Sequence, residues 1–107
     1  MNINDLFDRL PGALNADAAA GLDAIIQFNT SEPRYVHIKD GAATVTPGTS
    51  ESPKVAITMA DDDLVGLMSG SLDGMTAFMT GKLKVEGDLM FAQKVSQLFK
   101  GSSLKDG

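Results

Sequence analysis

Few side chains in this sequence could carry out chemistry, and the densest group of them is an aspartate triplet at residues 61–63. A calcium loop needs oxygen ligands at defined spacing and a bidentate carboxylate further along the chain, and that spacing is absent here. Three acids in a row instead suit the first turn of a helix, where they cap backbone N–H groups and face the positive end of the helix dipole. The triplet therefore predicts the start of a helix and no metal site.

The single histidine, His37, falls on the polar side of an expected strand, next to a turn. General acid–base catalysis needs a second positioned group, and no nucleophile–base pair stands out. Cysteine is absent, which excludes disulfides, thiol catalysis and thiolate metal sites. We therefore expect no catalytic residues, no cofactor and no enzyme activity.

A third group of polar residues, Lys82, Lys84 and Glu86, shares one face of a short expected strand. This face is either simply solvated, or it forms a basic lip that receives an anionic lipid headgroup. The sequence leaves both interpretations open.

The remaining distinctive group is apolar and concentrated in the second half of the chain. It comprises Met59, Met68, Met75, Met79, Met90, Phe78, Phe91 and Phe99. Periodicity alone favours an ordinary core. Methionine is flexible and polarizable, however, so methionine-rich surfaces also repack around varied apolar ligands.

Length and composition set the limits for these interpretations. The chain has 107 residues, which predicts one domain over 1–107, with a frayed tail at 101–107. Its net charge of −5 argues against nucleic acid, and against an anionic membrane as the main partner. No apolar run approaches the roughly 20 residues that cross a bilayer, and no signal-peptide pattern begins the chain. We expect a cytoplasmic protein with at most transient membrane contact.

The elements that position these groups follow from periodicity and turn signals. Helices are expected near 3–10, ending at Pro11-Gly12, and near 16–22, followed by strands near 24–29, 35–39, 43–45 and 55–59. Asp40-Gly41 predicts a type I′ hairpin between the second and third strands. Helices over 61–72, interrupted at Gly70, and over 73–79 then precede a strand at 82–86 and a helix at 88–99. Strands grouped first and helices later predict an α+β fold, with helices over one face of a mixed sheet.

The stretch from Met75 to Asp88 is the most informative part of the chain, because its period changes from helical to strand-like at Gly81. Together with residues 57–64 (ITMADDDL), 67–72 (LMSGSL) and 91–95 (FAQKV), it closely resembles the sterol carrier protein-2 family of lipid carriers. The order and spacing of these segments carry the resemblance, which covers about residues 5 to 100.

The resemblance implies a five-stranded sheet with helices over one face and an apolar tunnel between them. It also implies binding of fatty acids, acyl-CoA, phospholipids or sterol-like lipids without covalent chemistry. Carried over by position, the tunnel wall comprises Met68, Leu72, Met75, Phe78, Met79, Leu83, Val85, Phe91, Ala92, Val95 and Leu98. Lys82, Lys84 and Lys94 are the candidate headgroup residues.

The sequence departs from the family pattern at Met90, which is larger, and at Gln93, which is more polar. Both are expected either to narrow the tunnel or to add polarity to it. A second hypothesis also remains at this point. The same apolar face could serve a protein-interaction or scaffold module, including a homodimer, or an accessory module in quinone biosynthesis.

Overall fold

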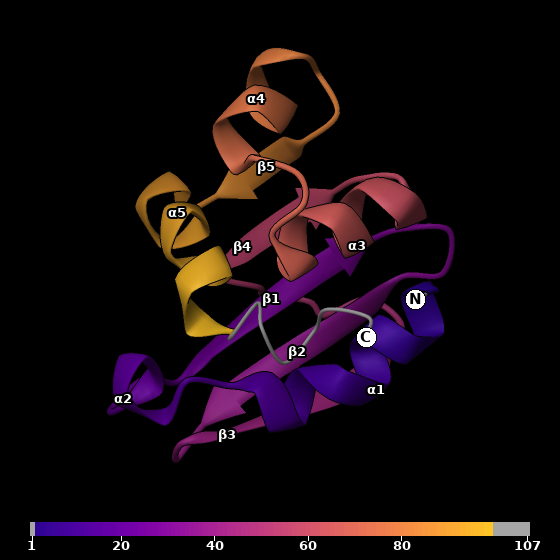
Figure 1. The fold of residues 1–107 in the computed structure, drawn as a ribbon. Helices are drawn as coiled ribbons and strands as arrows, with labels where there is room; N and C mark the ends of the chain where they lie inside the picture. The colour runs from indigo at the N-terminus through magenta and orange to yellow at the C-terminus, as the bar shows by residue number, and fades with distance from the viewer. Residues whose placement is uncertain (1, 100–107) are drawn as a thin grey trace.

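The computed structural model describes residues 2–99, apart from the side chain of Ser96, so the expected frayed tail lies outside the described residues. In chain order the elements are α1 (Ile3–Ala13), α2 (Ala16–Ala19), β1 (Ala24–Asn29), β2 (Arg34–Lys39), β3 (Ala42–Pro47), β4 (Val55–Thr58), α3 (Asp61–Ser69), α4 (Gly74–Met79), β5 (Lys84–Gly87) and α5 (Leu89–Leu98) (Figure 1). The expected order of helices and strands is confirmed.

The five strands form one mixed sheet in the order β3–β2–β1–β4–β5. The central strand β1 runs antiparallel to β2 and parallel to β4. At the two edges, β3 pairs antiparallel with β2, and β5 pairs antiparallel with β4. The hairpin expected at Asp40-Gly41 is confirmed, because both residues have the positive φ that a type I′ turn requires, 55° and 75°.

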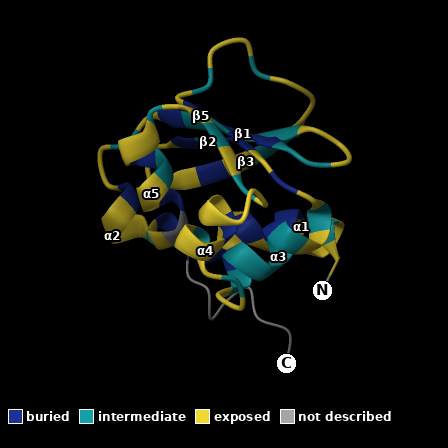
Figure 2. Cartoon of the chain, turned by 90° about the horizontal axis from the view of Figure 1, so that it is seen from above, coloured by how far each residue is buried: buried dark blue, intermediate teal, exposed yellow. Residues whose placement is uncertain are grey.

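The helices gather on one side of this sheet (Figure 2). Directly paired strand residues point to the same face, so Ile26, Val36 and Val55 share one face, and all three are fully buried. Here the rings of Phe7 on α1 and Phe28 on β1 meet edge to face, with their centroids 5.6 Å apart. The expected α+β fold is therefore confirmed, whereas an apolar tunnel between sheet and helices is not shown.

Helix α1 differs from the sequence prediction at its C-terminal end. It does not end at Pro11-Gly12 but continues through the proline to Ala13. Pro11 cannot donate a hydrogen bond within the helix. Leu10 and Ala13, however, are both fully buried, and this burial offsets the missing bond. Packing against the sheet thus overrides a local stop signal.

The aspartate triplet opens α3 as expected, but no side chain caps this helix. The N-cap residue is Ala60, and Asp61 instead accepts hydrogen bonds from the hydroxyl and the N–H of Ser31, at 2.6 and 2.9 Å. These bonds lower the pKa of the Asp61 carboxyl below its ordinary value. The first aspartate therefore ties the start of α3 to the loop after β1.

Among the described residues, one buried side chain is polar: Gln27 on β1, which is 2% exposed. Its Nε2 donates to the carbonyls of Arg34 and Gly48, both at 3.2 Å, and its Oε1 accepts the N–H of Ser50 at 2.7 Å. Gly48 and Ser50 belong to the segment that carries the chain from edge strand β3 to β4, beyond β1. Gln27 points to the face opposite the helices, because strand side chains alternate, and it holds this crossing segment against that face.

Candidate functional site

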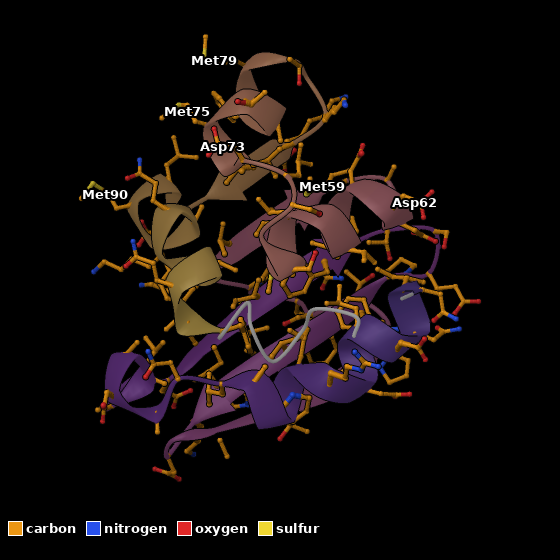
Figure 3. All side chains as sticks on the ribbon, in the orientation of Figure 1. Met59, Asp62, Asp73, Met75, Met79 and Met90 are labelled. Carbon is orange, nitrogen blue, oxygen red and sulfur yellow. The ribbon has the colours of Figure 1, made fainter. Side chains whose placement is uncertain are left out.

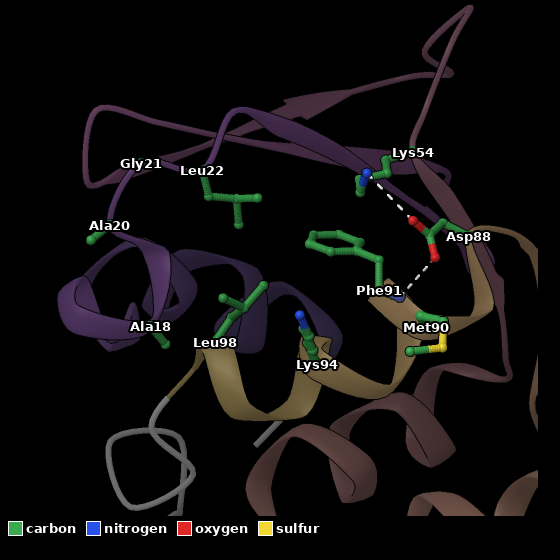
Figure 4. A pocket seen from close by; sticks show the side chains of 10 residues that line it. All are labelled: Ala18, Ala20, Gly21, Leu22, Lys54, Asp88, Met90, Phe91, Lys94 and Leu98. Atoms are coloured by element: carbon green, nitrogen blue, oxygen red, sulfur yellow. Dashed lines mark hydrogen bonds and ion pairs between the residues drawn. The ribbon is translucent and has the colours of Figure 1, made fainter.

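A pocket of about 350 Å³ lies between α5 and the segment formed by α2 and the residues after it (Figure 4). We call it the α2–α5 pocket. Its lining residues are Ala18, Ala20, Gly21, Leu22, Lys54, Asp88, Met90, Phe91, Lys94 and Leu98. Most of the lining residues are apolar, but polar atoms make up nearly half of the lining surface, two lysines and one aspartate among their sources, so a ligand there can make apolar and ionic contacts side by side.

The apolar wall of the pocket comes from α5, where Phe91 and Leu98 are buried, and from the half-buried Leu22 opposite. Helix α5 is fixed at both ends. Asp88 Oδ1 caps its start by accepting the N–H of Phe91 at 3.0 Å. Near its end, the carbonyl of Leu98 accepts the N–H of Asn15 at 2.7 Å. The position of the apolar wall is therefore fixed by hydrogen bonds within the protein.

The ionic side of the pocket is built around Lys54. Its Nζ lies 3.4 Å from Asp88 Oδ2 and 5.5 Å from the centre of the Phe91 ring. The N–H of Phe91, and then Lys54 itself, lower the pKa of the Asp88 carboxyl. Lys94 is exposed, and within residues 2–99 it has no ion-pair partner. One of the two lysines thus remains available to an anionic group.

The position of Lys54 depends on a close backbone approach at Gly87. The register of β4 and β5 pairs Val55 with Gly87, and the N–H of Asp88 donates to the carbonyl of Lys54 at 3.0 Å. A Cβ atom at Gly87 would lie only 2.7 Å from that carbonyl oxygen, and the residue has a φ of +100°. Glycine here permits the spacing that places Lys54 beside Asp88.

The eleven residues expected in a tunnel wall fall into three environments. Met68, Phe91, Val95 and Leu98 are buried, Leu72, Leu83, Val85 and Ala92 are half-buried, and Met75, Phe78 and Met79 are exposed. Phe91 and Leu98 line the α2–α5 pocket. The assignment of the whole set to one tunnel stays a prediction.

The three candidate headgroup lysines are also separated. Lys94 lines the pocket, whereas Lys82 and Lys84 do not. Lys84 pairs with Thr58 in the sheet, next to the pair of Ile57 and Val85 on the helix side, so its side chain points to the opposite face. Of the two residues expected to narrow a tunnel or to add polarity to it, Met90 lines the pocket, and Gln93 is exposed outside it.

Sequence reasoning missed Leu22 and Lys54. Leu22 directly follows Gly21, which ends an alanine-rich segment, and this signal indicated a helix end rather than a site. Lys54 reaches the pocket only because β4 pairs with β5 in one particular register. No local pattern encodes a register between strands so far apart in the chain.

The other candidates for chemistry lie elsewhere. His37 Nε2 lies 2.7 Å from Asp23 Oδ1, and both side chains are exposed. This hydrogen bond lowers the pKa of Asp23. Within residues 2–99 no group of three or more His, Asp or Glu side chains is placed to hold a metal ion. In the same range, no helix is both long and apolar enough to cross a membrane.

Comparison with known proteins shows which family the chain belongs to. The model of the SCP-2 sterol transfer family matches residues 3–100. The chain belongs to this family. Among SCP-2 relatives, peroxisomal multifunctional enzyme A of Dictyostelium discoideum is 32% identical over 99 residues, which cover 87% of this chain and 22% of that protein. Sterol carrier protein 2 of Bos taurus is 41% identical over 63 residues, which cover 59% of this chain and 12% of that protein.

Solved SCP-2 structures share the fold. Sterol carrier protein-2 from Aedes aegypti, solved in solution as a complex with the C16 fatty acid palmitate, superposes with a TM-score of 0.72. The match covers 96% of each chain at 15% sequence identity. At this identity the likeness establishes the fold alone.

Membership of the SCP-2 family confirms the resemblance seen in the sequence and supports lipid binding and transport. It favours this function over the protein-interaction module considered above. The chain spans less than a quarter of the length of the two relatives, one of which is named as an enzyme. The expected lack of enzyme activity therefore stays a prediction.

Proposed function

We propose that this chain binds an acyl lipid in the α2–α5 pocket and transfers it between lipid phases, without covalent chemistry. The observation that carries the proposal is the juxtaposition of a buried apolar wall, Phe91 and Leu98, with two lysines in one pocket of an SCP-2 fold. The palmitate complex of the Aedes aegypti protein supports it.

The lipid tail lies along Phe91, Leu98 and Leu22, and its anionic end meets Lys94. A volume of about 350 Å³ is at the small end of ligand pockets, which span roughly 300–1,000 Å³. The ligand class proposed is therefore a fatty acid or the acyl part of an acyl-CoA or phospholipid, and not a whole bulky sterol. The half-buried residues carried over from the family, Leu83 and Val85 among them, extend the wall for longer tails.

Filling the pocket should abolish binding. Ala18 on α2 is exposed and lines the pocket, so Ala18→Trp places a large ring in its mouth without disturbing the core. We expect delipidated A18W to bind a fluorescent fatty-acid analogue at least about tenfold more weakly than the unmodified chain, a loss of about 1.4 kcal/mol. The measurement is a fluorescence titration, followed by displacement with unlabelled lipids.

The matched control is Ala16→Trp, which adds the same ring to the same helix at an exposed position that does not line the pocket. A16W should bind the analogue as the unmodified chain does. Equal affinities for A18W and A16W would place the lipid elsewhere and refute the assignment to this pocket.

The ionic contact is tested separately by Lys94→Gln and Lys84→Gln, which remove one charge each from exposed residues on opposite sides of the sheet. A hydrogen bond to a charged group is worth about 1.5–3 kcal/mol, so K94Q should weaken fatty-acid binding by about tenfold or more. K84Q should not change it. The assignment of Lys94 to the headgroup fails if both variants lose affinity equally, or if neither does.

A further inference from the structure

The methionines within residues 2–99 fall into two environments. Met59 and Met68 are buried in the core, at 5% and 4% exposed, whereas Met75, Met79 and Met90 are 66%, 78% and 73% exposed. Figure 3 shows the last three pointing outward from the fold. Oxidants convert the thioether of methionine to a sulfoxide, and the oxidant must reach the sulfur atom to do so. In this part of the chain the exposed methionines are therefore open to oxidation, and the core methionines are shielded from it.

Met90 differs from the other exposed methionines because it lines the α2–α5 pocket. It lies in the first turn of α5, which Asp88 caps, so its backbone is fixed while its side chain borders the pocket. Lys94 follows four residues later, one helical turn along the same side of α5, and it lines the pocket too. Figure 4 shows the side chains of Met90 and Lys94 along this helix. An oxidant that reaches Met90 therefore acts at the site proposed for the lipid.

We propose that Met90 is a modification site, and that its oxidation to methionine sulfoxide by a hydroperoxide lowers the affinity of the pocket for acyl lipids. The sulfur lone pair attacks the terminal oxygen of the hydroperoxide, so that an S–O bond forms while the O–O bond breaks. The sulfur is oxidised by two electrons and the peroxide is reduced. The proton of the transferred oxygen passes to the other oxygen, which leaves as water or as an alcohol. This inference rests on the proposed function, because the affinity concerned is that of the proposed lipid pocket.

Oxidation of Met90 changes what a lipid contacts in the pocket. The thioether is apolar and packs against an acyl chain, whereas the sulfoxide carries a strong hydrogen-bond acceptor that water solvates in the free protein. A bound acyl chain displaces that water and supplies no hydrogen bond in return, which costs binding free energy. The sulfoxide oxygen also lies one helical turn from Lys94, so it competes with the anionic end of the lipid for the ammonium group. Both effects oppose binding.

The same modification has little effect on the fold, because Met90 does not belong to the buried core. A sulfoxide on this exposed side chain stays in contact with water, so it adds no buried polar group. A sulfoxide at Met59 or Met68 would place a polar group in the core and destabilise the fold. Mild oxidation should therefore lower lipid binding before it unfolds the protein.

The test treats the delipidated whole chain with hydrogen peroxide and follows each methionine by mass spectrometry of its peptides. Met90 should be converted at least about tenfold faster than Met59 and Met68. When Met90 is converted and the core methionines are not, the dissociation constant of the fluorescent fatty-acid analogue should have risen at least about fivefold. The midpoint of urea unfolding should not have changed. Methionine sulfoxide reductases that act on the two sulfoxide epimers should restore the affinity.

Two leucine variants show which sulfur atom is responsible. In Met90→Leu the affinity after peroxide treatment should equal the affinity before it, because leucine cannot form a sulfoxide. In Met75→Leu combined with Met79→Leu, peroxide should lower the affinity as it does in the unmodified chain. Each variant is compared with itself before treatment, so that any effect of the substitution alone cancels out.

The inference is overturned if Met90 resists oxidation while Met75 and Met79 react, or if M90L loses affinity as the unmodified chain does. It is also overturned if the affinity falls only when the urea midpoint falls with it. A18W separates this inference from the proposed function. If A18W binds the analogue normally, the lipid lies elsewhere and the proposed function fails. If A18W binds weakly and oxidation of Met90 leaves the affinity unchanged, only the role of Met90 fails.

Discussion

Replacing Gly87 by alanine is expected to destabilise the protein by about 3 kcal/mol, measured by urea unfolding. Two costs combine. Alanine is strained at a φ of +100°, and its Cβ would lie 2.7 Å from the carbonyl oxygen of Lys54 and 3.2 Å from the Cα of Val55. Both contacts are to backbone, which cannot rotate away, so β5 must move relative to β4. That movement also breaks the hydrogen bond from Asp88 to Lys54 at the pocket.

Gly81→Ala is the matched control, because Gly81 has a φ of +79° but no atom within 4 Å of the position that a Cβ atom would take. It should cost only the backbone strain, about 1–2 kcal/mol. The difference between the two variants isolates the close approach of the strands. Equal losses of stability would show that the close approach of Lys54 to Gly87 does not prevent a Cβ atom from fitting at residue 87.

Replacing Gln27 by methionine is expected to cost about 2 kcal/mol, although the two side chains are similar in length. The variant leaves the N–H of Ser50 and the carbonyls of Arg34 and Gly48 without their partner. The segment after β3 is then held less firmly against the sheet. Hydrogen exchange at the Ser50 amide should accelerate about tenfold beyond the change caused by lower global stability.

The same replacement at Gln97 provides the control. Gln97 is exposed on α5, and glutamine and methionine have similar helix propensities, so Q97M should leave stability within about 0.5 kcal/mol. If Q27M unfolds at the same urea concentration as Q97M, the buried amide does not hold the crossing segment.

The features that the sequence predicted well are those encoded by neighbouring residues. Asp73 and Asp88 cap α4 and α5, and Asp40-Gly41 makes the hairpin, because each signal acts within four residues. Gly70 ends α3 in the left-handed conformation for the same reason.

The features that the sequence could not predict depend on contacts between distant segments. The register of β4 against β5 brings Lys54 to the pocket, and burial of Ala13 carries α1 past its proline. Helical spacing places Met75, Phe78 and Met79 on a common face of α4, where all three are exposed, but spacing does not reveal whether anything covers such a face. The wall of a tunnel and an exposed patch have the same local pattern.

The contacts that join early and late segments of the chain have a consequence for synthesis in the cell. Leu14 pairs with Phe99 in an isolated bridge, and β1 gains its parallel neighbour only from β4. While the first half is leaving the ribosome, β1 therefore lacks β4 beside it, and β4 in turn lacks α5, which packs against it in the finished fold. Long-range contacts of this kind form slowly, and exposed strands aggregate. The domain should complete its fold only after α5 has emerged, so the nascent chain has its greatest need of chaperones before that point.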